Sequence, residues 1–328
     1  MATIVFPDHP SPVADAEALR KACQGWGTDE KAIISILGRR NAIQRKLIRQ
    51  AYEDLYQEDL VKRLESELSG DFEKAVYRWI LDPEDRDAVL LHVAMNEKPI
   101  DYRVIVEISC IYSPEELLGI KRAYQIRYKH SLEEDLAQHT TSDLRKVLGV
   151  VRTTNHSSSQ LLVGLVSVYR YRGEEINARV ANSEAYSLHS AIKEKAFNHE
   201  EVIRIITTRS KPQILATINQ YKDDHGSSIT KHLRGEASSE YLCALRTAIR
   251  CISDHEKYYE KVIRQALNKA DGIDEDSVTR VVVTRAERDL KEIKELFYKR
   301  NSLPIERAIA KDTSGHYKAF LLTLLEQD

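Results

Sequence analysis

The sequence predicts an all-α fold built from four copies of one helical unit, and three observations carry this prediction. Apolar residues recur at helical spacing, as at Ile33, Ile36 and Leu37. The same apolar pattern returns four times along the chain, which is typical of a repeat architecture. Runs of alternating apolar and polar residues, which would indicate strands, are absent from the sequence.

Four similar runs mark the copies: "IISILGRR" from Ile33, "IVEISCIY" from Ile105, "VIRIITTR" from Val202 and "VTRVVVTR" from Val278. The later three lie at offsets of 72, 169 and 245 residues from the first. Five further columns keep their character at these offsets: Tyr52, Tyr124, Tyr221 and Phe297; Leu60, Leu132, Ile229 and Ile305; Leu64, Leu136, Leu233 and Ile309; Phe72, Leu144, Tyr241 and Tyr317; Val76, Leu148, Leu245 and Leu321.

We predict an N-terminal arm over residues 1–12, because this segment holds three of the eight prolines. The copies are expected over 13–81, 84–153, 168–250 and 254–326, with about five short helices each. The first helix of copy one is "DAEALRKAC". The polar stretch "RTTNHSSSQ" is interpreted as a linker, so that the chain divides into two successive pairs of copies.

Each copy has an Asp or Asn at one equivalent position, which predicts the start of its second helix. Asp29, Asp101, Asn198 and Asp274 stand just before the second apolar helix. Their side chains can accept a hydrogen bond from a free amide of the first turn, which suits an N-cap.

Composition bounds the function. The 328 residues carry a formal net charge of −2, with 42% hydrophobic and 30% charged residues. Such a balance lacks the excess of positive charge that is typical of general nucleic-acid binding. The start, "MATIVFPDHPSPVAD", lacks the features of a signal peptide, and the longest apolar stretch, "LLVGLVSVY", is too short to span a bilayer. We therefore expect a cytoplasmic protein.

The sequence "KACQGWGTDEKAI" suggests a calcium site. The last carbonyls of a helix lack partners and carry the negative end of its dipole. The first helix should stop at Cys23, and Gly25 and Gly27 let the loop bend so that three carbonyl oxygens converge. Calcium takes six to eight oxygens and still needs a carboxylate, which Glu67, 39 residues beyond Thr28, can supply.

The other copies rank below the first. Copy four has Asn268, Ala270 and Gly272 in the loop, and Asp312 lies 39 residues beyond Ile273. Copy three keeps an acid, Glu236, but its loop "KEKAFN" lacks glycine, so a site there stays open. Copy two has "NEKPID" and places His139 in the acidic column, so no site is expected.

From about Val13 onward the chain resembles an annexin, and a plant annexin in particular. The repeated unit resembles the annexin repeat, and "GWGT" with its distant acid resembles the family's type II calcium loop. "SLEEDLAQHTTSD" and "TRAERDLKEI" are similar to plant members. The resemblance implies four repeats in a curved disc, with calcium loops on the convex face that bind acidic membranes reversibly.

The ligand set itself explains why such a site would need lipid. Three carbonyls and one bidentate carboxylate give five oxygens and one negative charge, so the Ca²⁺ ion keeps open positions and a net positive charge. Calcium affinity in solution should be weak and should tighten on anionic phospholipid membranes. Trp26 stands between the ligand glycines, and we expect its indole to enter the headgroup boundary.

Several alternatives are weaker. Peroxidase activity, reported for plant annexins, is linked by the resemblance to a histidine whose position here is Arg39, which speaks against haem. Nucleotide hydrolysis would use "DTSG", Asp312 to Gly315, but no phosphate-binding loop accompanies it. We expect no enzyme activity.

The remaining functional interpretations either have a structural alternative or lack a sequence feature that would distinguish them from the calcium-binding hypothesis. Cys110 and Cys251 match a redox cysteine pair proposed for plant members, although two buried cysteines that never meet are favoured. "IRI", Ile203 to Ile205, resembles an actin-binding tripeptide but also fits a core helix. A calcium-independent helical scaffold would not account for the paired loops and acids. Ion conduction is a family suggestion that the sequence neither supports nor excludes.

Overall fold

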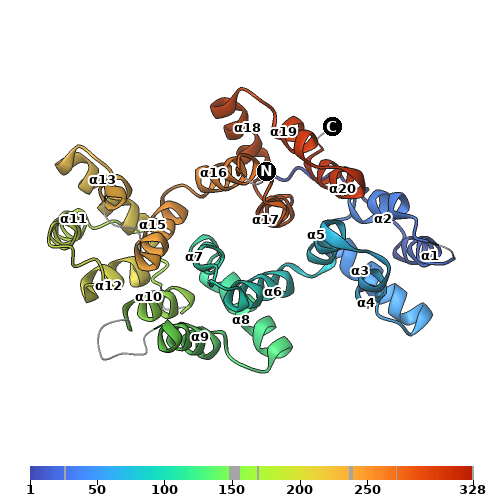
Figure 1. The fold of residues 1–328 in the computed structure, drawn as a ribbon, viewed down its shortest axis with the longest axis horizontal. Helices are drawn as coiled ribbons and strands as arrows, with labels where there is room; N and C mark the ends of the chain where they lie inside the picture. Colours follow the sequence, from blue (N-terminus) through green and yellow to red (C-terminus); the bar gives the residue numbers. More distant parts are fainter. Residues whose placement is uncertain (26, 148–155, 168–169, 236–238, 271, 327–328) are drawn as a thin grey trace. The chain divides into compact units, whose positions relative to one another are not determined.

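The computed structural model describes residues 1–25, 27–147, 156–167, 170–235, 239–270 and 272–326, with the side chains of 140–147, 156–159 and 235 left out. Within these ranges every regular element is helical and none is a strand. The predicted all-α class is therefore confirmed. Figure 1 shows the helices as coiled ribbons that are joined by loops.

The first and fourth repeats have five helices each. In repeat 1 these are α1 (Pro12–Ala22), α2 (Glu30–Leu37), α3 (Ala42–Tyr56), α4 (Leu60–Glu67) and α5 (Gly70–Ile80). In repeat 4 they are α16 (His255–Leu267), α17 (Glu275–Arg285), α18 (Leu290–Asn301), α19 (Ile305–Asp312) and α20 (Gly315–Leu325).

The middle of the chain is less regular. It holds α6 (Pro83–Asn96), α7 (Tyr102–Ile111), α8 (Pro114–Tyr128), α9 (Leu132–Val147), α10 (His156–Val166), α11 (Ala178–Lys193), α12 (Glu200–Thr208), α13 (Lys211–His225), α14 (Ile229–His232), the 3₁₀ helix η1 (Leu233–Gly235) and α15 (Glu240–Ser253). The prediction of a linker at "RTTNHSSSQ" is wrong from His156 onward, because α10 begins there and continues into the buried residues Leu161 and Leu162; its first four residues lie outside the described ranges.

The repeats do not pair in chain order. Unit 1 combines Met1–Arg86 with Glu256–Asp328, and unit 2 is Asp87–His255. In unit 1, α5 packs against α17 and α20; in unit 2, α7 packs against α15. The predicted pairing of successive copies is therefore wrong: apolar helix faces, and not the polar stretch between copies, decide which repeats share a core.

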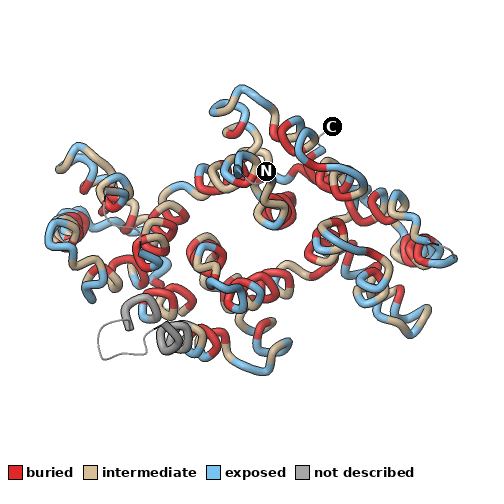
Figure 2. The backbone as a smooth tube through the Cα atoms, in the orientation of Figure 1, coloured by how far each residue is buried: buried red, intermediate tan, exposed pale blue. Residues whose placement is uncertain are grey.

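The predicted core columns are confirmed wherever side chains are described. Tyr52, Tyr124 and Tyr221 have no exposed surface, and Phe297 is 3% exposed. The columns headed by Leu60 and Leu64 are buried in all four repeats. Figure 2 shows the buried residues following the inward faces of the helices within each unit. Leu148 lies outside the described residues, as does the side chain of Leu144.

Three of the four predicted N-caps are confirmed. Asp29, Asp101 and Asp274 each accept a hydrogen bond from an amide of the first turn of α2, α7 and α17. In repeat 3 the prediction of Asn198 is wrong by one residue, because His199 caps α12 and its Nδ1 accepts from the Glu201 amide. A neutral imidazole nitrogen accepts a hydrogen bond, as an amide oxygen of asparagine does. Helix α12 therefore still has a side-chain N-cap, one residue later than predicted.

The first residues run without helix and lie along unit 1. The amide of Thr3 donates to the carbonyl of Ala286, and its hydroxyl donates to the carbonyl of Leu324 at 2.7 Å. The Gln44 side-chain amide donates to the carbonyl of Pro7 at 2.7 Å. These bonds tie repeat 4 to repeat 1 through the N-terminal segment. Helix α1 begins at Pro12, three residues before the predicted "DAEALRKAC", with Ser11 as its cap.

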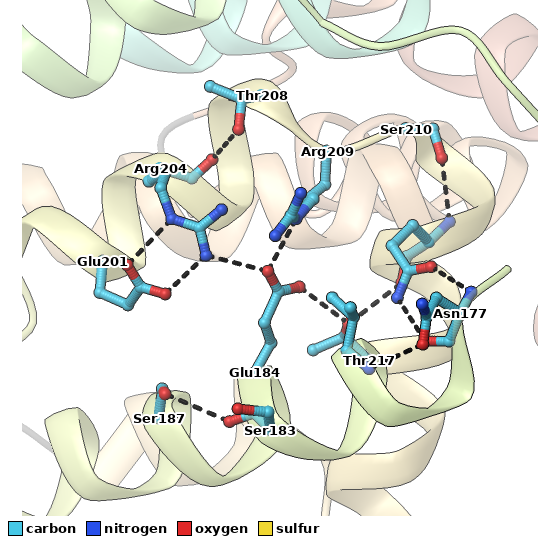
Figure 3. A network of polar contacts seen from close by, with 12 residues as sticks. Asn177, Ser183, Glu184, Ser187, Glu201, Arg204, Thr208, Arg209, Ser210 and Thr217 are labelled. Carbon is cyan, nitrogen blue, oxygen red and sulfur yellow. Dashed lines mark hydrogen bonds and ion pairs between the residues drawn. The ribbon is translucent and has the colours of Figure 1, made fainter.

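A repeated ion pair joins the first helix of a repeat to the end of its second. In repeat 3, Glu184 is buried and accepts from Arg204 at 3.0 Å, Arg209 at 2.7 Å and the Thr217 hydroxyl at 3.4 Å (Figure 3). In repeat 1, Arg40 makes a bidentate pair with Asp15 at 2.7 and 2.8 Å. The offset of 169 residues relates both pairs, so the arginines that close "IISILGRR" and "VIRIITTR" carried a signal that our sequence analysis did not use.

Candidate functional site

The loop between α1 and α2 turns at two glycines with positive φ angles. Helix α1 stops at Cys23, and Gly25 and Gly27 adopt φ values of +105° and +93°. Side chains rarely adopt this backbone region, and a Cβ on either glycine would meet no atom within 4 Å, so backbone conformation is what requires glycine there. The amide of Asp29 donates to the Ala22 carbonyl at 2.9 Å and closes the loop.

The structure brings Glu67 to this loop, as predicted. Glu67 is the last residue of α4, and its Oε2 accepts a hydrogen bond of 3.0 Å from the hydroxyl of Thr28. Nη2 of Arg63 lies 2.5 Å from the Cys23 carbonyl oxygen and 2.8 Å from Oε1 of Glu67. One nitrogen therefore joins the end of α1 to the acid at the end of α4.

Arg63 is a residue that our sequence analysis missed. Its spacing of four from Glu67 on one helix places both on the same face, and this i,i+4 relation was visible in the sequence. Both partners are partly exposed, 28% for the Arg63 side chain and 22% for that of Glu67. Solvent therefore reaches the site.

The surroundings of Cys23 favour its backbone carbonyl, and not its thiol, as the group that can face a cation. Burial, with the neighbouring Glu67 carboxylate, raises the pKa of the Cys23 thiol above its usual range. The sulfur stays protonated at neutral pH, since a thiol whose pKa is raised holds its proton. Its carbonyl oxygen, at the negative end of α1, is the group that can face a cation.

The loop of repeat 4 resembles that of repeat 1 in part: Ala270 lacks the positive φ of Gly25, and the loop closes one residue before the counterpart of Ala22. Gly272 has a φ of +112°, like Gly27, and the amide of Asp274 closes the loop on the Ala266 carbonyl at 3.0 Å. Asn268 and Ala270 are exposed just after α16. Ile273 replaces Thr28 and brings no hydroxyl toward the acid.

Asp312 ends α19 as Glu67 ends α4, and it is exposed. Together with Glu67 it lines a cavity of about 370 Å³ within unit 1. Glu30, Asp71 and Glu275 line the same cavity, which concentrates carboxylates beside both candidate sites. Such a cavity favours the approach of cations.

The remaining predicted positions divide into two groups. Trp26 and Glu236 lie outside the described residues. In repeat 2, Pro99 stands in the place of Gly27, and Nδ1 of His139 contacts the backbone oxygen of Asp135 at 2.7 Å. Repeat 2 therefore offers no carboxylate at the position of Glu67.

The residues predicted for alternative activities are mostly buried or engaged in ion pairs. Arg39 is exposed and pairs with Glu326 at 2.8 Å. Cys110 and Cys251 are buried free thiols on α7 and α15, two helices that pack together. Burial raises the pKa of the Cys110 thiol to about 11, which disfavours the reactive thiolate. In "IRI", Ile205 is fully buried and Arg204 pairs with Glu184 and Glu201.

The oxygen donors of repeat 1 suit calcium. Two of them, the Cys23 carbonyl and the Glu67 carboxylate, flank one point at which a cationic nitrogen lies, so both donors can face a cation. The described part of the chain holds no cluster of three or more His, Cys, Asp or Glu side chains suited to a metal. Backbone oxygens would therefore have to supply most ligands.

Four helical repeats, with the first loop of repeat 1 beside the acid that ends its fourth helix, define a repeat protein with a candidate cation site between helix ends. The annexin family model matches residues 14–79, 86–151, 183–247 and 258–324, and the chain belongs to the annexin family. None of the helices in the described ranges is long and apolar enough to cross a membrane.

Known proteins agree with this assignment. The chain is 64% identical to annexin-like protein RJ4 of Fragaria ananassa over 328 residues, which cover both proteins in full. It is 51% identical to annexin D7 of Arabidopsis thaliana, covering 100% of this chain and 99% of the relative. Among solved structures, a calcium-bound annexin (Sm)1 matches with a TM-score of 0.80 and 26% identity, covering 100% of this chain and 93% of the other.

Proposed function

We propose that this annexin binds anionic phospholipid membranes in a calcium-dependent manner through the loops of repeats 1 and 4, with repeat 1 the stronger. The observation that carries the proposal is the meeting of Glu67 with the α1–α2 loop, through Thr28 at 3.0 Å and through Arg63. The calcium-bound state of annexin (Sm)1 supports calcium as the cation.

In repeat 1 the Cys23, Gly25 and Gly27 carbonyls with Glu67 would hold calcium, and in repeat 4 the Asn268, Ala270 and Gly272 carbonyls with Asp312. When bound, the ion supplies a positive centre with open coordination positions, which an anionic phosphate fills better than water does. The chain's own part is to orient oxygen donors at two helix ends, where the dipole is negative.

Two loops in one compact unit strengthen attachment. Glu67 and Asp312 border the same cavity, so both loops can engage one membrane patch. The second contact then forms at a high effective concentration, and the combined affinity exceeds that of either loop. Binding is reversible, and the protein is proposed to move between the cytoplasm and membranes as calcium changes.

Vesicle co-sedimentation tests the proposal. Vesicles of phosphatidylserine and phosphatidylcholine should sediment the protein at millimolar calcium, whereas phosphatidylcholine alone, or excess chelator, should leave it in the supernatant. Equal sedimentation with and without calcium would instead support the helical scaffold. No sedimentation at millimolar calcium would refute the function.

A further inference from the structure

We propose that Arg63 is an internal counter-cation of the repeat 1 loop, which calcium has to displace, so that this residue sets the calcium concentration at which repeat 1 engages a membrane. The inference rests on the proposed function and adds a determinant of affinity to the same site. It starts from one atom, Nη2 of Arg63, which lies 2.5 Å from the Cys23 carbonyl oxygen and 2.8 Å from Oε1 of Glu67.

The position of this nitrogen follows from two helix ends. Helix α1 stops at Cys23 and helix α4 ends at Glu67, so two negative dipole ends and a carboxylate meet. A positive group stabilises such a meeting point. Without calcium the Arg63 guanidinium supplies it, and charge-assisted hydrogen bonds hold the loop and the acid together.

The same contacts oppose calcium. With Arg63 in place, the charges of Glu67 and the guanidinium cancel, and an arriving ion meets a neutral site whose donors are already engaged. Calcium has to break both bonds of Nη2 and then lie beside a positive charge. Because both side chains are partly exposed, solvent screens this competition, and we expect a moderate effect and not an absolute block.

The guanidinium is not fully satisfied where it lies. Its Nε is buried and has no hydrogen-bond partner among the described residues. Moving Arg63 away therefore costs the two bonds of Nη2 and frees a buried donor. An anionic headgroup can accept the released guanidinium, because phosphate oxygens are strong acceptors for arginine. Membrane and calcium then act together on one side chain.

Arg63 is particular to repeat 1. At the offsets that relate the copies, Asp135, His232 and Ala308 take its place. His232 has its own contact, a 2.7 Å bond between its Nδ1 and the hydroxyl of Tyr221. In repeat 4, Ala308 leaves Asp312 without a guanidinium four residues before it. The two candidate sites of unit 1 therefore differ in whether calcium meets an internal competitor.

The test measures calcium binding by repeat 1 alone, because an Asp312→Asn background removes the acid of repeat 4. Calcium is titrated against phosphatidylserine–phosphatidylcholine vesicles, and terbium(III) luminescence in solution, sensitised by Trp26, gives a membrane-free readout. Arg63→Met, which removes the charge and keeps an apolar stem, should lower both midpoint concentrations about three- to tenfold. Arg63→Lys, which keeps the charge, should stay close to the parent.

Three controls separate this effect from general destabilisation. Arg49→Met removes an arginine that pairs with Asp82 at 2.5 Å, with exposures of 21% and 29%, and should leave both midpoints unchanged. Adding Glu67→Gln to Arg63→Met should abolish the gain. Arg63→Gln should act in the same direction as Arg63→Met, and it replaces that variant if the latter does not fold, as judged by circular dichroism.

The outcomes also distinguish the two proposals. Unchanged or raised midpoints in both charge-removing variants, with calcium-dependent sedimentation intact, would overturn the role of Arg63 and leave the proposed function standing. Absence of calcium-dependent sedimentation in every variant, the parent included, would overturn the proposed function itself. A gain that persists in the Glu67→Gln background would place the effect of Arg63 elsewhere and so refute it.

Discussion

The loops of repeats 1 and 4 lie in one compact unit and use the same register, yet they hold their acids differently. In repeat 1, Thr28 and Arg63 both bond to Glu67. In repeat 4 the matching residues are Ile273 and Ala308, which have no polar side-chain group to offer Asp312. Repeat 1 thus has an acid fixed in place with an internal cation beside it, whereas repeat 4 has an exposed acid. The difference teaches that the repeat register places an acid at the end of the fourth helix in both copies, while the residues around that acid decide whether it is held in place.

The largest change in calcium-dependent membrane binding is expected when the Glu67 or the Asp312 carboxylate is removed. Glu67→Gln should raise the calcium midpoint for vesicle binding about tenfold, since it removes the single negative charge of the loop that we propose to be the stronger. Asp312→Asn should raise it about threefold. Co-sedimentation over a calcium series measures both. Equal effects, or a larger effect of Asp312→Asn, would contradict the ranking of repeat 1 above repeat 4.

The next effect tests the loop backbone apart from its charge. Gly27→Ala forces a side chain into a φ of +93°, which costs about 1–2 kcal/mol unless the loop rearranges. The carbonyl oxygens then turn away, and the calcium midpoint should rise about fivefold. The matched control is Gly226→Ala, at a φ of +64° at the end of α13 in unit 2. It should lower thermal stability and leave the midpoint unchanged; an equal rise in both variants would refute the loop argument.

Much of this comparison was accessible from sequence. Buried columns such as that of Tyr52 follow from helical spacing and recur at fixed offsets, so the core, the helix class and the position of Glu67 beside the first loop were predicted correctly. The pairing of repeats was not, because it depends on which apolar faces meet, as between α5 and α17, and the spacing of copies along the chain carries no such information. Arg63 was also missed: an i,i+4 pair is common on helix surfaces, and only the fold brings the Cys23 carbonyl to the same nitrogen.

A third effect concerns Trp26, which stands between Gly25 and Gly27. Replacing Trp26 by phenylalanine should raise the calcium midpoint about twofold to threefold, because phenylalanine lacks the indole's preference for the headgroup boundary. In a Trp79→Phe protein, calcium with anionic vesicles should shift the emission of Trp26 to shorter wavelength. The control is Trp26→Phe, in which Trp79 should not respond, since its ring is fully buried and its Nε1 donates to the Leu37 carbonyl at 2.7 Å. Emission of Trp26 that ignores vesicles would contradict insertion at repeat 1.

The smallest effect exchanges a single hydroxyl between the two loops. Thr28→Val removes the 3.0 Å bond to Oε2 of Glu67 and makes repeat 1 resemble repeat 4, where Ile273 stands. A partly exposed hydrogen bond to a carboxylate contributes about 0.5–1.5 kcal/mol, of which positioning of Glu67 is one part, so the calcium midpoint should rise about twofold. The reciprocal change, Ile273→Thr, should lower the midpoint of repeat 4 when that repeat is measured in a Glu67→Gln background. A lower midpoint in Thr28→Val would mean that the hydroxyl competes with calcium for Oε2, as Arg63 is proposed to do for Oε1, and would reverse the part we assign to Thr28.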